Sequence, residues 1–471
     1  MPPTLMWMSP ANGATNASVD TRITLGFSES VTVGSNAIRV SGPSGAVTTT
    51  VTVSGANVTL TPVNPLSPGQ KYTITITSGV KGAAGNAYAG STASFIATAQ
   101  ALSLAAGAMV SDSYYAYRWS SPPAQPWDVL QYLRGNGFRW LRMWVTTLSY
   151  PELRTTSDWS TLPWESGNYW ACLEASGAVL AAAAALGFRL QAVLFLSDQS
   201  AHAGKQPLAV TWAGLTPTQL AAAVQESAAA TASYYQSLGL NIEVFEIGNE
   251  IDFGVCGINM GTTVPVPAGV DPVNTTSWME ENIWGPSAPL LKAAISGVLS
   301  VYPNAKILLH VAGFGYSRGN IAAYSFFQSM VNLGVPFDIA GLSYPYMFGG
   351  GNGVPQPYFA QADFLSALDS IAAVGRPIQI VEFDYPAAPA GTTTTPSPSY
   401  PFTPVGQAKF VQDLANAVNG RVESLWYWYA DYYPGWPDAT NNPELVSSGL
   451  FSAYNTPRPA MAVFKQPPFA T

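Results

Sequence analysis

The pattern of hydrophobic and polar positions divides the chain into two regions with different periods. From residue 1 to about residue 97, short segments alternate apolar and polar side chains, which is the period of a half-buried β-strand. Gly, Pro, Asn and Ser separate these segments at the spacing typical of an all-β sandwich. The predicted strands are 21–27, 37–42, 46–55, 57–63 and 71–79.

The period changes after a junction at residues 97–107. Beyond it, alanine-rich helical stretches alternate with short buried strands, which predicts a (β/α)8 TIM barrel, with a doubly wound sheet as the alternative. No glycine-rich phosphate turn follows any of these strands, so the usual ligand argument for the alternative is missing. We therefore expect a small Ig-like β-sandwich domain over 1–98 and a barrel domain over 99–471. The eight predicted barrel strands are 103–110, 138–145, 189–196, 242–248, 306–313, 338–345, 378–383 and 423–430.

Charge and composition exclude several classes of partner. The chain has a net charge of −8 and no basic run, which argues against nucleic acid, and no apolar run is long enough to span a membrane. Two histidines argue against a multi-histidine metal centre, and we expect neither a metal nor a cofactor. The first ten residues show no signal peptide, yet the Ser/Thr-rich, Lys-poor composition favours a secreted or cell-surface protein. Cys172 and Cys256 could pair, but nothing local in the sequence decides this.

Two carboxylates occupy positions at which a barrel carries its chemistry. Active sites of these barrels form at the carboxyl ends of the strands, where Glu250 follows the fourth strand and Glu382 ends the seventh. Glycosidic cleavage needs such a pair, one to protonate the leaving oxygen and one to face the anomeric carbon. A separation of about 5 Å would imply retention of configuration, and roughly 6.5–9.5 Å inversion.

Other polar and aromatic residues at the strand ends are candidates for substrate binding, and each has a structural alternative. Arg142 could instead be a structural ion-pair partner, His310 a core histidine and Asp198 a helix cap. The abundant aromatic residues, 14 Trp and 23 Tyr, could stack on sugar rings or fill the core. The candidates are Arg142, Trp144, Asp198, Asn249, His310, Tyr344, Tyr346 and Trp428.

These strand ends carry a resemblance to a known family. The stretches FRWLRMWV, EIGNEIDFG, FDIAGLSYPY and VEFDYP follow one another in the order of the clan A glycoside hydrolases. Within that clan the chain resembles family 53, the endo-β-1,4-galactanases, over roughly residues 125–465. The first region resembles bacterial Ig-like domains, which implies a spacer or docking module.

The resemblance implies a role for each candidate. Glu250 would be the general acid/base and Glu382 the nucleophile, kept ionised by hydrogen bonds from Arg142 and Tyr344. Asn249 would bind the sugar 2-OH, and His310 would bind Glu250 or substrate. The resemblance also makes Trp428 the stacking floor beside the cleaved bond and Trp144 a further wall.

The chain departs from the family pattern at several positions near the predicted sugar subsites. Phe195 and Leu196 stand where the family commonly has His-Tyr, and Ser200 replaces a tryptophan. His202 and Ala203 replace Asp-Pro, and Tyr429-Ala430 replaces Glu-Pro.

The departures leave two alternatives to a galactanase. One is a clan A hydrolase acting on a glucan, mannan or xylan, and the other is a carbohydrate-binding protein without catalysis. The expected partner is a polysaccharide or oligosaccharide substrate, and the chain is expected to be monomeric.

Overall fold

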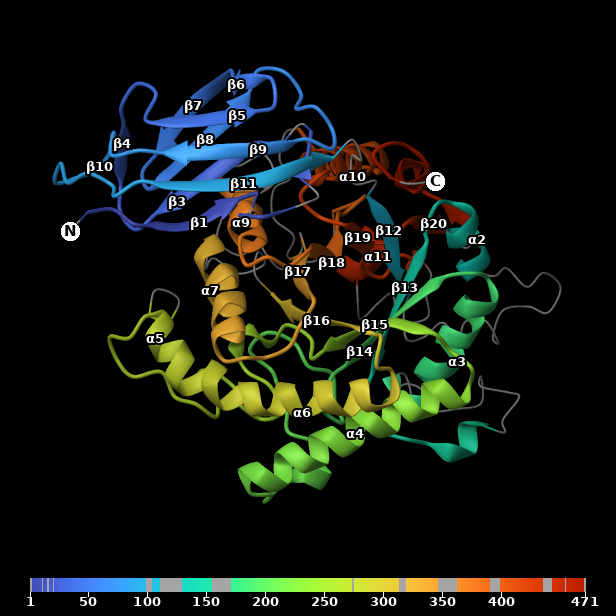
Figure 1. Ribbon diagram of the computed structural model, residues 1–471. Helices are drawn as coiled ribbons and strands as arrows, with labels where there is room; N and C mark the ends of the chain where they lie inside the picture. Colours follow the sequence, from blue (N-terminus) through green and yellow to red (C-terminus); the bar gives the residue numbers. More distant parts are fainter. Residues whose placement is uncertain are drawn as a thin grey trace. The chain divides into compact units, whose positions relative to one another are not determined.

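The computed structural model separates the chain into two compact units. The first comprises residues 1–103, 358–378 and 417–423, and the second comprises residues 104–357, 379–416 and 424–471. Figure 1 traces the elements of each unit. The structure describes residues 2–10, 12–14, 17–19, 21–98, 104–110, 129–154, 171–272, 275–312, 319–345, 362–389, 399–434, 443–453 and 455–469.

The first unit contains the predicted antiparallel sandwich. One sheet has the strand order β1-β3-β8-β7, and a second has the order β2-β11-β9-β5-β6. The predicted strand over 46–55 is two strands in the structure, β6 and β7, which belong to different sheets. The strands are β1 (Leu5–Ser9), β2 (Ala17–Ser18), β3 (Ile23–Phe27), β4 (Val31–Val33), β5 (Ile38–Gly42), β6 (Gly45–Val47), β7 (Thr49–Ser54), β8 (Asn57–Pro62), β9 (Lys71–Ile76), β10 (Val80–Gly82) and β11 (Ser91–Thr98).

Helix α9 (Ala362–Ala372) belongs to this first unit and packs against β1 and β3. Its Asp369 is buried, accepts a hydrogen bond from Thr24 Oγ1 at 3.4 Å, and pairs with Arg421 Nε at 3.1 Å. Burial raises the pKa of Asp369, although Arg421 and Thr24 favour its ionised form. A carboxylate therefore ties the helix to the sandwich, which the apolar pattern alone does not predict.

The second region forms the predicted TIM barrel. Eight parallel strands close in sequence order, with β12 paired to both β13 and β19. Each overlaps the strand expected from the sequence, so the barrel prediction is confirmed. The strands are β12 (Ala105–Met109), β13 (Trp140–Val145), β14 (Arg189–Leu194), β15 (Ile242–Ile247), β16 (Lys306–Val311), β17 (Ile339–Pro345), β18 (Ile378–Asp384) and β19 (Ser424–Tyr427).

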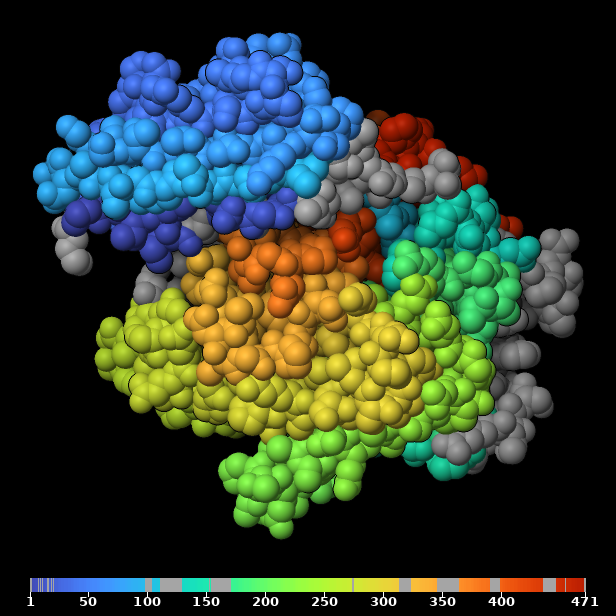
Figure 2. All heavy atoms as spheres, viewed as in Figure 1, coloured from blue at the N-terminus to red at the C-terminus, as the bar shows by residue number. Residues whose placement is uncertain are grey.

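Helices cover the outside of the barrel. Helix α4 begins with a capping box, in which Thr216 before the helix and Gln219 in its first turn exchange hydrogen bonds. It packs along α6, and Figure 2 shows the light-green side chains of α4 beside the yellow ones of α6. Besides α9, the described α-helices are α2 (Val129–Gly135), α3 (Leu173–Ala185), α4 (Pro217–Ser237), α5 (Thr276–Met279), α6 (Gly285–Val301), α7 (Gly319–Asn332), α10 (Pro404–Val418) and α11 (Pro443–Ser448).

A tightly packed apolar layer fills one level of the barrel interior. The Trp426 ring leaves so little space beside Gly107 that a Cβ there would lie 2.2 Å from it. Only glycine permits this approach of β12 to β19. The layer contains Trp140, Val244, Leu308, Ile339, Val381 and Trp426.

Candidate active site

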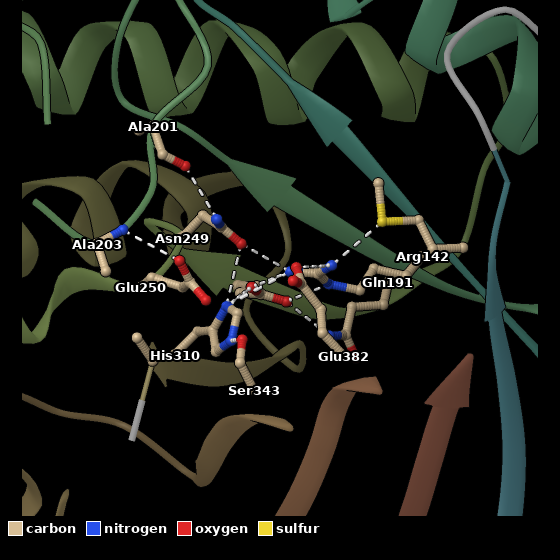
Figure 3. A network of polar contacts seen from close by, with 12 residues as sticks. Arg142, Gln191, Ala201, Ala203, Asn249, Glu250, His310, Ser343 and Glu382 are labelled. Carbon is tan, nitrogen blue, oxygen red and sulfur yellow. Dashed lines mark hydrogen bonds and ion pairs between the residues drawn. The ribbon is translucent and has the colours of Figure 1, made fainter. Parts of the chain in front are cut away.

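A buried polar cluster occupies the carboxyl ends of the barrel strands. Figure 3 shows Glu382, Asn249 and His310 gathered around the guanidinium of Arg142, with Glu250 beside them. Arg142 and His310 are fully buried, and Glu382 and Glu250 expose only 5% and 9% of their surface. Buried charges persist only when they are paired, so the contacts of this cluster carry its chemistry.

Arg142 lies at the centre and binds two carboxylates. Its Nε and Nη2 donate to the two carboxylate oxygens of Glu246 at 2.9 and 2.6 Å, and its Nη1 donates to Glu382 Oε1 at 2.6 Å. Burial lowers the pKa of Arg142, but the two glutamates outweigh burial and raise it, so the side chain stays cationic. The hydrogen bond to Glu382 that the sequence analysis expects is therefore present.

Glu246 has a larger part in this cluster than its position in the sequence suggests. Gln191 Nε2 donates to its Oε2 at 2.9 Å, and His310 Nδ1 lies 2.8 Å from its Oε1. Burial alone would raise the pKa of Glu246, but Arg142 and His310 lower it to about 2. The signal available for Glu246 is its period-two spacing with Val244 on β15, which puts both side chains on one face of the strand, and no signal singles out Gln191.

His310 holds the cluster together from β16. Its Nδ1 also lies 3.1 Å from Asn249 Oδ1, and its Nε2 lies 2.7 Å from Ser343 Oγ. Burial lowers the pKa of His310, but the charge of Glu246 outweighs it and raises the pKa. The described contacts of His310 include Glu246, Asn249 and Ser343, and its expected binding of Glu250 or substrate stays a prediction.

Glu382 and Glu246 both bind Arg142, which donates one hydrogen bond to Glu382 and two to Glu246. Burial raises the pKa of Glu382, and the charges of Glu250 and Glu246 act in the same direction. Arg142 and His310 oppose this rise without cancelling it. That hydrogen bonds keep Glu382 ionised stays a prediction, and Arg142 gives its bidentate face to Glu246 and a single hydrogen bond to Glu382.

Glu250 follows β15 in a strained backbone conformation. Its φ of 51° and ψ of 56° are left-handed, and it immediately precedes the short helix η5 (Ile251–Phe253). Left-handed conformations of bulky residues cluster at functional sites, where the surrounding structure enforces them. The Glu250 Oε2 accepts a hydrogen bond from the backbone N–H of Ala203 at 3.0 Å.

Asn249 is fixed on both sides of its amide. Its Nδ2 donates to the carbonyl of Ala201 at 2.9 Å, and its Oδ1 accepts from Arg142 Nη2 at 2.9 Å.

Asp252, two residues beyond Glu250, is also buried and accepts from the Ala312 N–H at 3.2 Å. Burial raises the pKa of Asp252 to about 7. The sequence analysis did not single out Asp252, because a carboxylate after a strand usually lies in solvent.

Aromatic rings adjoin the carboxylates. Trp144 lies with its ring centroid 5.2 Å from Phe195 and 5.6 Å from Tyr429, and Trp428 lies 4.8 Å from Tyr429. Trp144 is 8% exposed, whereas Trp428 is partly exposed. Two of the positions that depart from the family pattern, Phe195 and Tyr429, thus pack directly on Trp144.

The remaining candidates lie in different surroundings. Asp198 is partly exposed, and its Oδ2 accepts a hydrogen bond at 2.9 Å from Val210, the first residue of η4 (Val210–Trp212), which fits the capping alternative. Tyr344 is buried, with its ring 6.2 Å from that of Phe410, and its predicted donation to Glu382 stays a prediction. Tyr346 lies outside the described residues.

Cys172 and Cys256 are not joined by a disulfide in the structure, which answers the question that the sequence left open. Cys172 accepts a hydrogen bond from Ala175 N–H at the start of α3, and Cys256 donates to the Leu196 carbonyl. Within the described ranges, no three His, Cys, Asp or Glu residues are grouped to hold a metal ion. No helix in that same part of the chain is long and apolar enough to cross a membrane.

Comparison with known proteins gives two family matches that together cover most of the chain. Residues 1–97 match the bacterial Ig-like domain, and residues 109–464 match glycosyl hydrolase family 53. The second match spans well over half of the chain and includes every residue of the polar cluster.

Among similar proteins, a probable arabinogalactan endo-β-1,4-galactanase A of Aspergillus tubingensis is 24% identical over 58% of this chain and 72% of its own length. An arabinogalactan endo-β-1,4-galactanase of Thermothelomyces thermophilus is 26% identical over 50% of this chain and 65% of its own length. An uncharacterized Niallia circulans protein is 31% identical over 165 residues, which make up 32% of this chain and only 42% of that relative.

Solved structures support the fold. The family 53 catalytic domain of Ignisphaera aggregans aligns with a TM-score of 0.59 and 23% identity, covering 77% of this chain and 96% of that domain. A fungal β-1,4-galactanase aligns with a TM-score of 0.58 and 20% identity, covering 77% of this chain and 99% of the other. At these identities the likeness shows the barrel fold alone.

Proposed function

Because the chain belongs to glycosyl hydrolase family 53, we propose that it cleaves a β-1,4-linked galactan or arabinogalactan with retention of configuration. The observation that carries the mechanism is the hydrogen bond of 2.6 Å between Arg142 Nη1 and Glu382 Oε1, with Glu250 close enough to perturb the pKa of Glu382. One carboxylate thus touches a fixed cation, and the other does not touch it. Such asymmetry separates the roles of two acidic groups.

In the first step, Glu382 attacks the anomeric carbon while Glu250 gives its proton to the glycosidic oxygen. The carbon–oxygen bond to the leaving sugar breaks, that sugar departs as an alcohol, and a glycosyl ester forms on Glu382. Arg142 keeps its contact with Glu382 and orients the attacking oxygen. Glu246 stays ionised in this proposal and holds the guanidinium in place.

In the second step, Glu250 is a carboxylate and takes a proton from water. The water oxygen bonds to the anomeric carbon, and the ester bond to Glu382 breaks, which restores both carboxyl groups. Asn249, held between Arg142 and Ala201, is positioned to bind the sugar 2-OH. Trp428 offers a partly exposed ring for stacking on the sugar.

The names of the two fungal relatives, both arabinogalactan endo-β-1,4-galactanases and one of them only probable, support galactan as the substrate. A second candidate is a different β-linked glycan, such as a glucan, mannan or xylan. Phe195 and Tyr429, which depart from the family pattern and pack on Trp144, favour this alternative, because they alter the wall that a sugar would meet.

The decisive experiment is product analysis across a panel of β-1,4-galactan, arabinogalactan, glucan, mannan and xylan. We expect oligosaccharides from galactan, with the β-anomer formed first when the products are followed by NMR. Because burial raises the pKa of Glu382, the acid limb of the rate profile should lie above the ordinary glutamate value of about 4.3.

Glu382→Gln should lower kcat by at least about 10⁴-fold, because it removes the nucleophile and keeps its shape. Glu243→Gln, which neutralises a partly exposed glutamate on β15, is the matched control and should keep the wild-type rate. Equal activity of Glu382→Gln and the wild type would refute the catalytic assignment. Binding of galactan without any release of reducing ends by the wild type would instead favour a binding protein.

A further inference from the structure

A β-turn of the loop after β14 lies against the side chain of Glu250. His202 and Lys205 exchange backbone hydrogen bonds of 2.9 and 2.8 Å across Ala203 and Gly204. Gly204 has a φ of 76°, and Ala203 has a negative φ. Positive φ at only the second central residue is the signature of a type II turn.

The N–H of the first central residue is not used within such a turn, because the hydrogen bonds join the two flanking residues. Here this N–H belongs to Ala203, and it donates to Glu250 Oε2 at 3.0 Å. Ala203 is 7% exposed, so water competes little for the bond. A proline, which the family pattern has at this position, would carry no N–H, so the donor depends on the alanine of this chain.

The turn is held rigidly at the end of β15. Gln206 Nε2 donates to the carbonyls of Asn249 at 2.8 Å, Glu250 at 3.2 Å and His202 at 3.2 Å. Asn259 in turn holds the Gln206 backbone, accepting from its N–H at 2.5 Å and donating to its carbonyl at 2.9 Å. One buried amide therefore fixes the Ala203 turn and the Glu250 backbone relative to each other.

We propose that the Ala203 N–H holds Oε2 of Glu250 and so assigns Oε1 as the oxygen that exchanges the proton with the glycosidic oxygen and with water. The inference rests on the proposed function of Glu250 as the acid/base. Ala203 is a positioning residue, since it acts through Glu250. The Ala203 N–H donates to Oε2, so a proton on Oε2 would place two hydrogen-bond donors against each other. The proton of the neutral Glu250 carboxyl is therefore favoured on Oε1.

The same N–H stabilises the ionised carboxylate more than the neutral acid, since charge-assisted hydrogen bonds are the stronger ones. Removing this donor therefore destabilises the ionised form of Glu250 relative to the neutral acid. The other charged groups around the site stay unchanged when this single donor is removed. They are Asp252 on η5, Arg142 on β13, Glu246 on β15, His310 on β16, Glu382 on β18 and the turn residues His202 and Lys205.

The cleanest test replaces the amide by an ester, Ala203→lactic acid, introduced by nonsense suppression, with alanine inserted by the same route as control. The ester removes the N–H without changing the side chain, and it also weakens the His202 carbonyl as an acceptor from Lys205 and Gln206. We expect the basic limb of kcat/KM on β-1,4-galactan to move upward by about one pH unit. The acid limb, which reports Glu382, should stay in place.

A second variant, Ala203→Pro, is compatible with a type II turn, which favours proline at this position. Its ring displaces Oε2 as well as removing the donor. We therefore expect about a tenfold loss with a 4-nitrophenyl β-galactobioside and a clearly smaller loss with the 2,4-dinitrophenyl compound, whose leaving group needs no proton. Glu243→Gln, the control outside the polar cluster, leaves the Ala203 N–H in place and should match the wild type in both assays.

An unchanged basic limb in the ester variant, together with equal losses on the two aryl substrates in Ala203→Pro, would overturn the inference and leave the proposed function intact. If the wild type hydrolyses neither galactan nor the aryl galactobiosides, the proposed function fails instead. The two failures are distinguishable because the wild-type profile is measured first.

Discussion

The core of the sandwich and the mouth of the barrel are both buried, but they are built from opposite kinds of side chain. All members of the sandwich core cluster are apolar or aromatic, with Ile23, Leu25 and Ile74 fully buried. At the barrel mouth, Arg142, Glu246 and His310 are equally buried and charged or titratable. Replacing a buried ion pair by apolar residues is often neutral or stabilising, so such pairs are weak evidence for stability. The difference is what the proposed function requires, with packing in the sandwich and chemistry at the barrel mouth.

The largest expected effect follows from removing the cation at the barrel mouth. Arg142→Met should lower kcat by at least about 10³-fold and the free energy of unfolding by about 4 kcal/mol, because Glu246 would be left buried without its partner. The double variant Arg142→Met/Glu246→Gln should recover most of the stability and none of the activity. Denaturant unfolding and kcat measured on the same samples check this; recovery of both would mean that the pair is structural.

A cavity in the sandwich should have the opposite pattern of effects, with lower stability and unchanged activity. Leu25→Ala should lower the free energy of unfolding of the sandwich by about 3 kcal/mol, because a fully buried side chain loses its contacts and leaves a void. The kcat on soluble oligosaccharides should stay at the wild-type value, since the residues of the polar cluster all belong to the other compact unit. Val51→Ala, at a position that is 45% exposed, is the control and should change stability little. A fall in kcat for Leu25→Ala at temperatures where it stays folded would show that the sandwich core also affects activity.

The buried carboxyl of Asp252 should make the stability of the barrel mouth depend on pH. Because burial raises its pKa to about 7, the folded protein keeps a proton on this carboxyl that the unfolded chain has lost above pH 4. Its contribution to stability is present at low pH and disappears as the pH rises through 7. Between pH 5 and 7 this amounts to roughly 2 kcal/mol.

Asp252→Asn should remove this contribution to the pH dependence while keeping the oxygen that accepts from Ala312. The measurement is the difference in unfolding free energy between wild type and variant at several pH values. A difference that does not vary between pH 5 and 7 would show that Asp252 is ionised throughout the range.

The smallest effect belongs to an ion pair outside the barrel interior. Arg189 and Glu243 lie 2.5 Å apart at the start of β14 and β15, with side chains 56% and 30% exposed. Arg189→Ala should change the unfolding free energy by less than about 1 kcal/mol, because solvent screens the pair. Comparison with Arg142→Met shows how much more unfolding free energy is lost when the removed arginine is buried. A change of several kcal/mol would point instead to the packing of Arg189 over the Trp140 ring.

Much of the fold could be predicted from the chain. The alternation of apolar residues predicted the sandwich, and the eight buried runs predicted the barrel strands to within a few residues, because each period is a local property. The split of 46–55 into two strands was not predictable, since the break depends on which sheet each half joins. The packing of α9 on β1 and β3 was likewise hidden, because it joins segments over 300 residues apart.

The candidate site divides in the same way. The carboxylates Glu250 and Glu382 could be singled out because both follow strands whose carboxyl ends must meet. The clamp of Glu246 on Arg142 and the raised pKa of Asp252 could not, because they depend on burial and on distances of about 3 Å between side chains. A pattern that gives only the order and type of strands does not specify either.

By itself, then, the sequence predicted two regions of different fold, the order of the barrel strands and the two glutamates proposed for catalysis. The tertiary structure decided how those carboxylates differ. Barrel closure brings Arg142 to Glu382, 240 residues away, and a two-residue turn brings the Ala203 N–H to Glu250, 47 residues away. The physical reason is that hydrophobic period is written along the chain, whereas a hydrogen bond depends on the distance and direction that only the closed barrel fixes.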